Sequence, residues 1–212
     1  MRRLVLALAT WLAATIAAGE TLKTLNLSRP AEGLTTVALK AGVGDIQIQA
    51  DPGDQITVRV EVKSKDGFFS SDRQARREIE SADIQAHVSG SELMLSLTPE
   101  HRDGGHWVED WTVRLPAASG VSVKLGVGDT TVLDLTGDVR VEVGVGDVRI
   151  EGQYQSFGDL HAACGVGDVN LRTPSGHDEG SGFISHTLKA QGPGRALVRA
   201  HAGVGDVRIR LR

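Results

Sequence analysis

Five aspartates recur in one short motif, and their carboxylates are the groups in this sequence best placed to do chemistry. The motif GVGD starts at Gly42, Gly126, Gly144, Gly165 and Gly203. Carboxylates brought together by a repeat could hold Ca²⁺, because this ion is bound by oxygen ligands. If the aspartates of neighbouring copies lie about 5 Å apart, their charges repel by roughly 1 kcal/mol in water, so something must relieve that repulsion.

The spacing of the motif favours a structural corner over a calcium site. Calcium-binding repeats of glycine and aspartate have a period of about nine residues, whereas the copies from Gly126 onward are 18, 21 and 38 residues apart. Glycine adopts backbone angles that other residues avoid, and an aspartate can accept a hydrogen bond from a nearby backbone N–H. We therefore predict that these residues form structural turns: Gly42, Gly44, Asp45, Gly126, Gly128, Asp129, Gly144, Gly146, Asp147, Gly165, Gly167, Asp168, Gly203, Gly205 and Asp206.

Arginines follow the motif on the same strand face. Arg149 and Arg208 come two residues after Asp147 and Asp206, so we expect each aspartate to cap its own turn and to meet a neighbouring cation. The candidate binding surface consists of the arginines that follow three of the motifs: Arg149, Arg172, Arg208 and Arg210.

The remaining polar clusters do not predict an enzyme. A loop rich in possible ligands contains His101, Asp103, His106, Glu109 and Asp110, but the spacing of its two histidines fits no closed zinc site. No nucleophile elbow is present. We therefore predict no catalytic residues, no metal and no cofactor. We expect the single cysteine, Cys164, to be buried and inert because it falls at an inward position of the pattern.

The segments around each motif read as strands. Apolar residues alternate with polar ones before every GVGD, as in Val139, Val141 and Val143, which is typical of a strand with one buried face. After the motif the apolar positions change parity, as in Val148 and Ile150. A continuous strand would keep its parity, so the motif must be a corner or a bulge.

This recurrence predicts an all-β fold, a repeat-built single-chain β-helix or solenoid-like stack with a short helical and strand insertion. A meander of hairpins is the alternative. We divide the chain into a signal peptide (1–19) and a single β-repeat domain (20–212), with an irregular insertion at 62–115 and the most regular repeats at 116–212. In the insertion we expect a helix capped near Ser71. Strands should follow at 83–88, 92–97 and 111–115.

The first residues, MRRLVLALATWLAATIAAGE, combine two arginines with an apolar run and small residues, which is typical of a secretory signal. The predicted location is therefore periplasmic or secreted, with no membrane span after cleavage. The chain has a formal net charge of −4, which argues against nucleic acid as a partner.

The sequence also resembles a known family. The order VALKAGVGDIQIQ, a variable middle, WTVRLPAASGVSVKLGVGDTTV and GDVRVEVGVGDVRIEG resembles the bacterial putative-adhesin family, a domain of unknown function also called toastrack. The resemblance covers most of the chain after the signal. It implies a β-helix-like stack in envelope or extracellular proteins, with roles in adhesion, envelope-stress sensing or scaffolding, and it implies no catalytic residues.

The sequence thus predicts a non-catalytic envelope or secreted module that presents a rigid surface to an envelope protein or a glycan. Two other functions stay open. One is a carbohydrate-active β-helix enzyme, which would need a groove with clustered carboxylates and aromatic rings. The other is a structural protein that self-associates through exposed strands.

Overall fold

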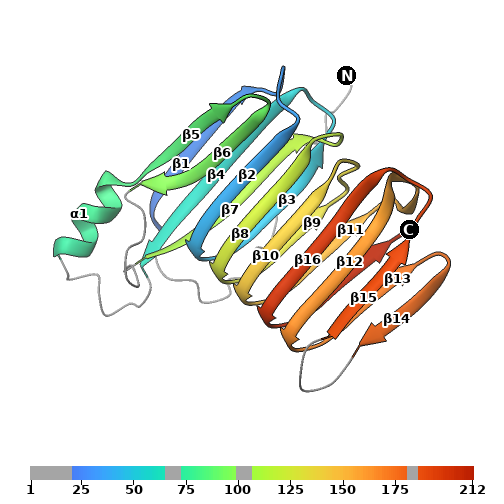
Figure 1. Cartoon of the computed structure of the whole chain (residues 1–212). Coiled ribbons are helices and arrows are strands. Elements are labelled where there is room, and N and C mark those ends of the chain that lie inside the picture. The colour runs from blue at the N-terminus through green and yellow to red at the C-terminus, as the bar shows by residue number, and fades with distance from the viewer. Residues whose placement is uncertain (1–20, 65–72, 99–106, 181–185) are drawn as a thin grey trace, which may run out of the picture.

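Two large β-sheets face each other and enclose one hydrophobic core in this computed structural model, which describes residues 21–64, 73–98, 107–180 and 186–212 (Figure 1). The strands of the nine-stranded sheet are, in spatial order, β1 (Thr21–Pro30), β4 (Gln55–Ser64), β7 (Trp107–Pro116), β3 (Ile46–Asp51), β9 (Thr130–Leu133), β11 (Val148–Gly152), β17 (Val207–Leu211), β13 (Val169–Thr173) and β14 (Gly176–Gly180). Those of the eight-stranded sheet are β15 (His186–Gln191), β12 (Phe157–Val166), β16 (Ala196–Val204), β10 (Val139–Val145), β8 (Gly120–Val127), β2 (Thr36–Val43), β6 (Glu92–Thr98) and β5 (Asp83–Ser89).

Each GVGD motif is the corner at which the chain passes from the eight-stranded sheet to the nine-stranded sheet. The strand pairs that meet there are β2–β3, β8–β9, β10–β11, β12–β13 and β16–β17. The predicted change of parity is confirmed: Val139, Val141 and Val143 are buried before one corner, and Val148 and Ile150 are buried after it. The corner therefore keeps the apolar side chains of both strands in the space between the sheets.

The corners do not stack in the order of the sequence. Strand β16 lies between β10 and β12, and β17 lies between β11 and β13, so the last repeat is inserted between the third and the fourth. Strands β14 and β15 explain how this happens. Each runs antiparallel to its neighbour at the end of its sheet, so the chain turns back before it enters the gap as β16. The central strands are therefore parallel although the connections are not sequential.

The prediction of an all-β fold is confirmed, but the predicted β-helix is not found. In the described residues both sheets are open, and each is mixed, with parallel strands in the centre and antiparallel strands towards its ends. A β-helix would need the chain to wind in one direction throughout, whereas here the chain reverses its direction at the antiparallel strands near the ends of both sheets. Alternation along a single strand does not reveal such reversals.

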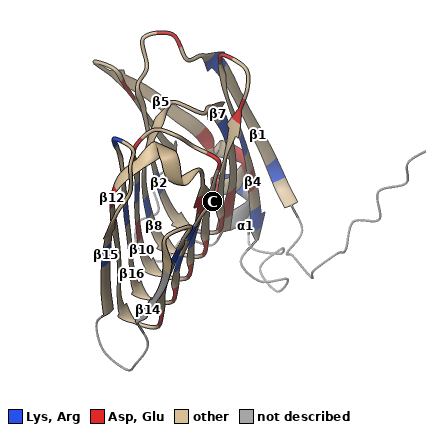
Figure 2. Ribbon diagram, turned by 90° about the vertical axis from the view of Figure 1, so that its right-hand side faces the viewer, with Lys and Arg blue, Asp and Glu red and all other residues tan. Residues whose placement is uncertain are grey.

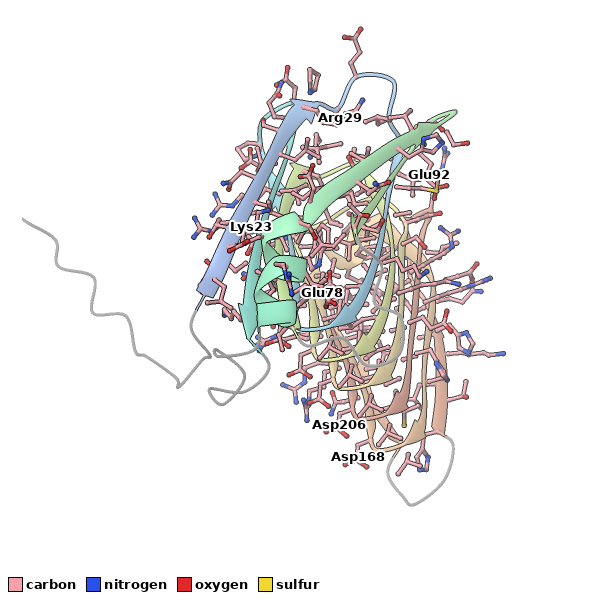
Figure 3. The ribbon with its side chains drawn as sticks, turned by 90° about the vertical axis from the view of Figure 1, so that its left-hand side faces the viewer. Lys23, Arg29, Glu78, Glu92, Asp168 and Asp206 are labelled. Carbon is pink, nitrogen blue, oxygen red and sulfur yellow. The ribbon has the colours of Figure 1, made fainter. Side chains whose placement is uncertain are left out.

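The stretch 62–115 contributes to both sheets. Helix α1 (Arg73–Ser81) and the three expected strands are present, as β5, β6 and a longer β7. Strand β6 pairs with β2, and β7 pairs with β3, so this stretch extends the stack at its N-terminal end. Lys23 of β1 donates hydrogen bonds from Nζ to the carbonyl oxygens of Glu80 (2.7 Å) and Ala82 (2.6 Å), which ties the end of α1 to the first strand. Figure 3 shows Lys23 close to this helix.

The proposed signal, residues 1–19, lies outside the described residues. In the part of the chain that the structure does describe, none of the helices has the length and apolar character needed to cross a bilayer.

Candidate functional site

The five motif aspartates form a hydrogen-bonded ladder along the corners. In each step the Oδ1 atom of one aspartate accepts a hydrogen bond from the backbone N–H of the aspartate in the next corner. The steps run from Asp129 N to Asp45 Oδ1 (3.0 Å), Asp147 N to Asp129 Oδ1 (2.8 Å), Asp206 N to Asp147 Oδ1 (2.8 Å) and Asp168 N to Asp206 Oδ1 (2.9 Å). Figure 3 labels Asp206 and Asp168, the last two members.

This ladder corrects one expectation about the aspartates. Asp45, Asp129, Asp147 and Asp206 do not cap their own turns, because each of these four carboxylates reaches across to the neighbouring corner. A hydrogen bond from a backbone N–H to a carboxylate is charge-assisted, and it places a partial positive charge between successive carboxylates. The ladder therefore offsets the repulsion that stacking creates. No group of three or more His, Cys, Asp or Glu side chains among the described residues is arranged to hold a metal ion.

The two glycines of the motif are needed for different reasons. The second glycine has a positive φ in every copy, for example +138° at Gly146 and +135° at Gly205. The first glycine lies against the backbone of the neighbouring corner, and a Cβ added to Gly144 would come 2.5 Å from the carbonyl oxygen of Gly126. The same distance recurs at Gly126, Gly165 and Gly203. A side chain at either glycine would therefore prevent the close contact that the ladder requires.

Side chains from β7 complete the ladder at its N-terminal end. Asp110 Oδ1 accepts the hydrogen bond from Asp45 N (3.1 Å), and its Oδ2 forms an ion pair with Lys63 Nζ (2.5 Å). The hydrogen bond that Lys63 Nζ donates to Asp110 Oδ2, together with the attraction to this carboxylate, raises the pKa of Lys63. Strand β7 thus supplies an aspartate where no sixth GVGD exists.

Glu109 is buried beside this end, with an exposed fraction of 2%. Its Oε1 accepts a hydrogen bond from Gly42 N (2.5 Å), and its Oε2 accepts one from Trp111 Nε1 (3.1 Å). Burial raises the pKa of Glu109 more than these two hydrogen bonds lower it. The sequence grouped Glu109 with possible metal ligands, but the structure gives its carboxylate a role in satisfying two N–H groups.

The four arginines of the candidate binding surface lie on adjacent strands of the nine-stranded sheet. Arg149 is opposite Arg208, and Arg210 is opposite Arg172. Part of their charge is compensated, since Arg208 pairs with Asp147 (3.0 Å) and Asp206, and Arg149 pairs with Glu151. The expected contact between a motif aspartate and an arginine is thus found for Arg208. Arg149 instead pairs with a glutamate of its own strand.

The valines of the motif form a feature that the sequence analysis missed. Val127, Val145, Val166 and Val204 are each about half exposed, at 46–50%. Register places them opposite one another along the corner as a continuous ridge beside the aspartate ladder. Alternation alone could not find this ridge, because it continues from Val139, Val141 and Val143 to place Val145 on the inward side, whereas Val145 is exposed at the corner.

Other residues that the sequence singled out have structural positions. Cys164 is buried and its Sγ lies 3.0 Å from the carbonyl oxygen of Gly167, as expected for an inert thiol. The carbohydrate-active alternative needs exposed aromatic rings, and two of the tryptophans, Trp107 and Trp111, are instead buried in the core. The histidines of the polar loop, His101 and His106, lie outside the described residues.

Comparisons with known proteins add solved structures of low similarity. No known family profile matches the chain. None of the curated proteins matches its sequence either. A putative cell adhesion protein from Clostridium sporogenes is 16% identical, with a TM-score of 0.47, over 90% of this chain and all of that one. A putative adhesin from Bacteroides fragilis is 12% identical, with a TM-score of 0.32, over 88% of this chain and 97% of that one. A putative adhesin from Parabacteroides merdae is 8% identical, with a TM-score of 0.34, over 69% of this chain and 62% of that one.

The descriptions of these structures agree with the family resemblance noted from the sequence, the bacterial putative-adhesin family. At these identities and TM-scores they carry no argument about function, which is therefore built from this chain's own residues.

Proposed function

We propose that this protein is a non-catalytic binding or scaffold module of the cell envelope or of the secreted fraction, which presents a rigid β-sheet surface to a protein or a glycan. The observation that carries the proposal is the aspartate ladder. It holds five corners in one register, so outward side chains from distant parts of the sequence are fixed in rows. A preformed surface loses little conformational entropy when a partner binds.

The arginine surface, consisting of Arg149, Arg172, Arg208 and Arg210, is the proposed contact area for a protein partner. These side chains come from three adjacent strands and are exposed. Their ion pairs with Glu151, Asp147 and Asp206 create a surface of mixed charge. Mixed charge gives specificity and orientation more than affinity, which suits a scaffold that must choose one partner.

The test is a cross-linking experiment with the tagged chain in native envelope, in which captured proteins are identified by mass spectrometry. We expect one saturable partner whose capture is lost in the double variant Arg149→Gln and Arg210→Gln. Arg59→Gln is the matched control, because Arg59 pairs with Glu61 two residues later, as Arg149 does with Glu151. Capture that is equal in all three proteins would refute this contact area.

Self-association is a second candidate, and the free sheet edges favour it. Strands β1 and β14 end the nine-stranded sheet, and β15 and β5 end the other. The outer backbone groups of an end strand can pair with another chain. Light scattering over a range of concentrations tests this function, and a size that stays monomeric throughout would rule it out.

A further inference from the structure

A row of cationic and imidazole side chains crosses the outer face of the eight-stranded sheet. Register places Arg140 opposite Arg199, Arg199 opposite His161, and His161 opposite Lys189. These four residues come from β10, β16, β12 and β15, which are consecutive strands of the sheet. Neighbouring strands are about 4.8 Å apart, so the row presents one such side chain at each step of that length. We call these four residues the basic row. Figure 2 colours the Lys and Arg positions of the sheet blue.

The basic row keeps uncompensated charge although acidic groups are near. Arg140 pairs with Asp138 (3.1 Å). Two residues further along β10, Glu142 lies opposite Lys124 of β8, and the Lys124 Nζ atom is 3.8 Å from Glu142 Oε2. Arg199 and Lys189 have no acidic partner within the described ranges. Asp159, the remaining acidic residue on this face near the row, accepts a hydrogen bond from Gln191 Nε2 (3.0 Å). The centre of the row is therefore available to an anion, on a chain whose net charge is negative.

The surface beside the basic row is hollowed along its length. A hollow of about 480 Å³ is lined by Arg140, Arg199 and His161, together with the small residues Ser122 and Ala163. A second hollow of about 290 Å³ continues past Lys189 and shares Arg199 and His161 with the first. Basic side chains thus line both hollows, together with one acidic side chain in each, Glu142 in the first and Asp159 in the second. The shape suits an extended chain that lies across the strands.

We propose that the basic row binds an extended acidic polysaccharide that carries one carboxylate on each sugar. In an extended polymer of this kind successive rings face opposite ways, so the carboxylates on one side recur at every second sugar. Two ring lengths are close to twice the strand spacing, about 10 Å, which is the separation of Arg199 on β16 and Lys189 on β15 across β12. Arginine forms paired hydrogen bonds with a carboxylate, and histidine and lysine can donate to carboxylates or hydroxyl groups.

An acidic peptide fits this row less well. In an extended peptide, side chains on the same face repeat every two residues, which is about 6.8 Å, and this length does not match the strand spacing. Stacking on a large aromatic ring plays no part, because no Phe, Tyr or Trp of the described residues lines either hollow. Recognition would therefore depend on charge and hydrogen bonds, and it would weaken as salt is added.

This inference concerns a different face from the arginine surface, so it holds or fails independently of the protein partner proposed above. The test is isothermal titration of the purified chain with polygalacturonate, which has a carboxylate on every sugar. We expect binding that weakens with salt. We also expect the double variant Arg199→Gln and Lys189→Gln to lower the affinity by about tenfold or more, since two direct charge contacts are lost.

Arg114→Gln is the matched control for these substitutions. Arg114 is an exposed strand residue of the nine-stranded sheet, so its substitution removes one positive charge from the other face, as each of the two substitutions does from this face. Its variant should bind like the wild type, and the melting temperatures of all the variants should agree within a few degrees. Equal loss in Arg114→Gln, or no loss in the double variant, would overturn the proposal. So would equal binding of neutral dextran. Polyglutamate that competes as strongly as polygalacturonate would overturn the assignment of a polysaccharide and indicate an acidic peptide.

Discussion

The close contact between corners can be tested by adding a single methyl group to it. Gly144→Ala is the most direct change, because Gly144 lies in the middle of the ladder and its φ does not require glycine. The new Cβ would come 2.5 Å from the carbonyl oxygen of Gly126, a backbone atom that cannot rotate away. Strands β8 and β10 would have to move apart, or the corner would have to distort.

The expected loss of stability follows from this geometry. Overpacking of a close contact costs about 1–3 kcal/mol. Separation of the corners also strains neighbouring hydrogen bonds such as that from Gly128 N to Val145 O (2.9 Å), each worth about 0.5–1.5 kcal/mol. Together these effects predict a decrease of about 2–4 kcal/mol in the free energy of unfolding. For a chain of this size that corresponds to a melting temperature lower by roughly 5–15 °C.

Two comparisons make the measurement specific. Gly176→Ala adds the same methyl group where no atom lies within 4 Å, so the melting temperature should change little. Asp147→Asn keeps an Oδ1 atom that can accept from Asp206 N and loses the exposed ion pair with Arg208, which is worth about 0–1 kcal/mol. Urea unfolding followed by circular dichroism would give the three values. If Gly144→Ala cost no more than Asp147→Asn, the argument that the corners depend on close backbone contact would be wrong.

Three further predictions concern buried groups. Thr130 is buried among apolar side chains, and in the described part of the chain no partner reaches its Oγ1 atom. Thr130→Val should therefore raise the free energy of unfolding by about 1 kcal/mol. A lower free energy of unfolding in urea would contradict this prediction. Folding raises the pKa of Glu109. The contribution of Glu109 to the free energy of unfolding is therefore greatest below the pKa that this side chain has in the unfolded chain, and it falls as the pH rises through its pKa in the folded protein. The stability of the wild type relative to Glu109→Gln should therefore be higher at pH 4 than at pH 7, and the opposite trend in urea titrations would refute the burial argument. The thiol of Cys164 should react with a disulfide reagent only when the chain unfolds, so rapid labelling of the native protein would show that the corner opens.

The sequence by itself determined the local structure of the repeats. Alternation of apolar residues and its change of parity at GVGD predicted which side chains are buried on each side of the corner, and the burial of Val141 and Ile150 agrees. Helix α1 and the strands that follow it were also predictable, because period and breaker residues act over a few neighbouring positions.

The tertiary structure alone decided which corners are neighbours. Nothing local distinguishes Gly203 from Gly165, yet the last repeat lies between the copies that begin at Gly144 and Gly165. That order determines which aspartate accepts a hydrogen bond from which N–H, so Asp147 contacts Asp206, 59 residues away. It also brings Arg140 and Arg199 side by side in the basic row. Strand pairing depends on contacts between distant segments, so a pattern that repeats almost identically cannot specify its own order.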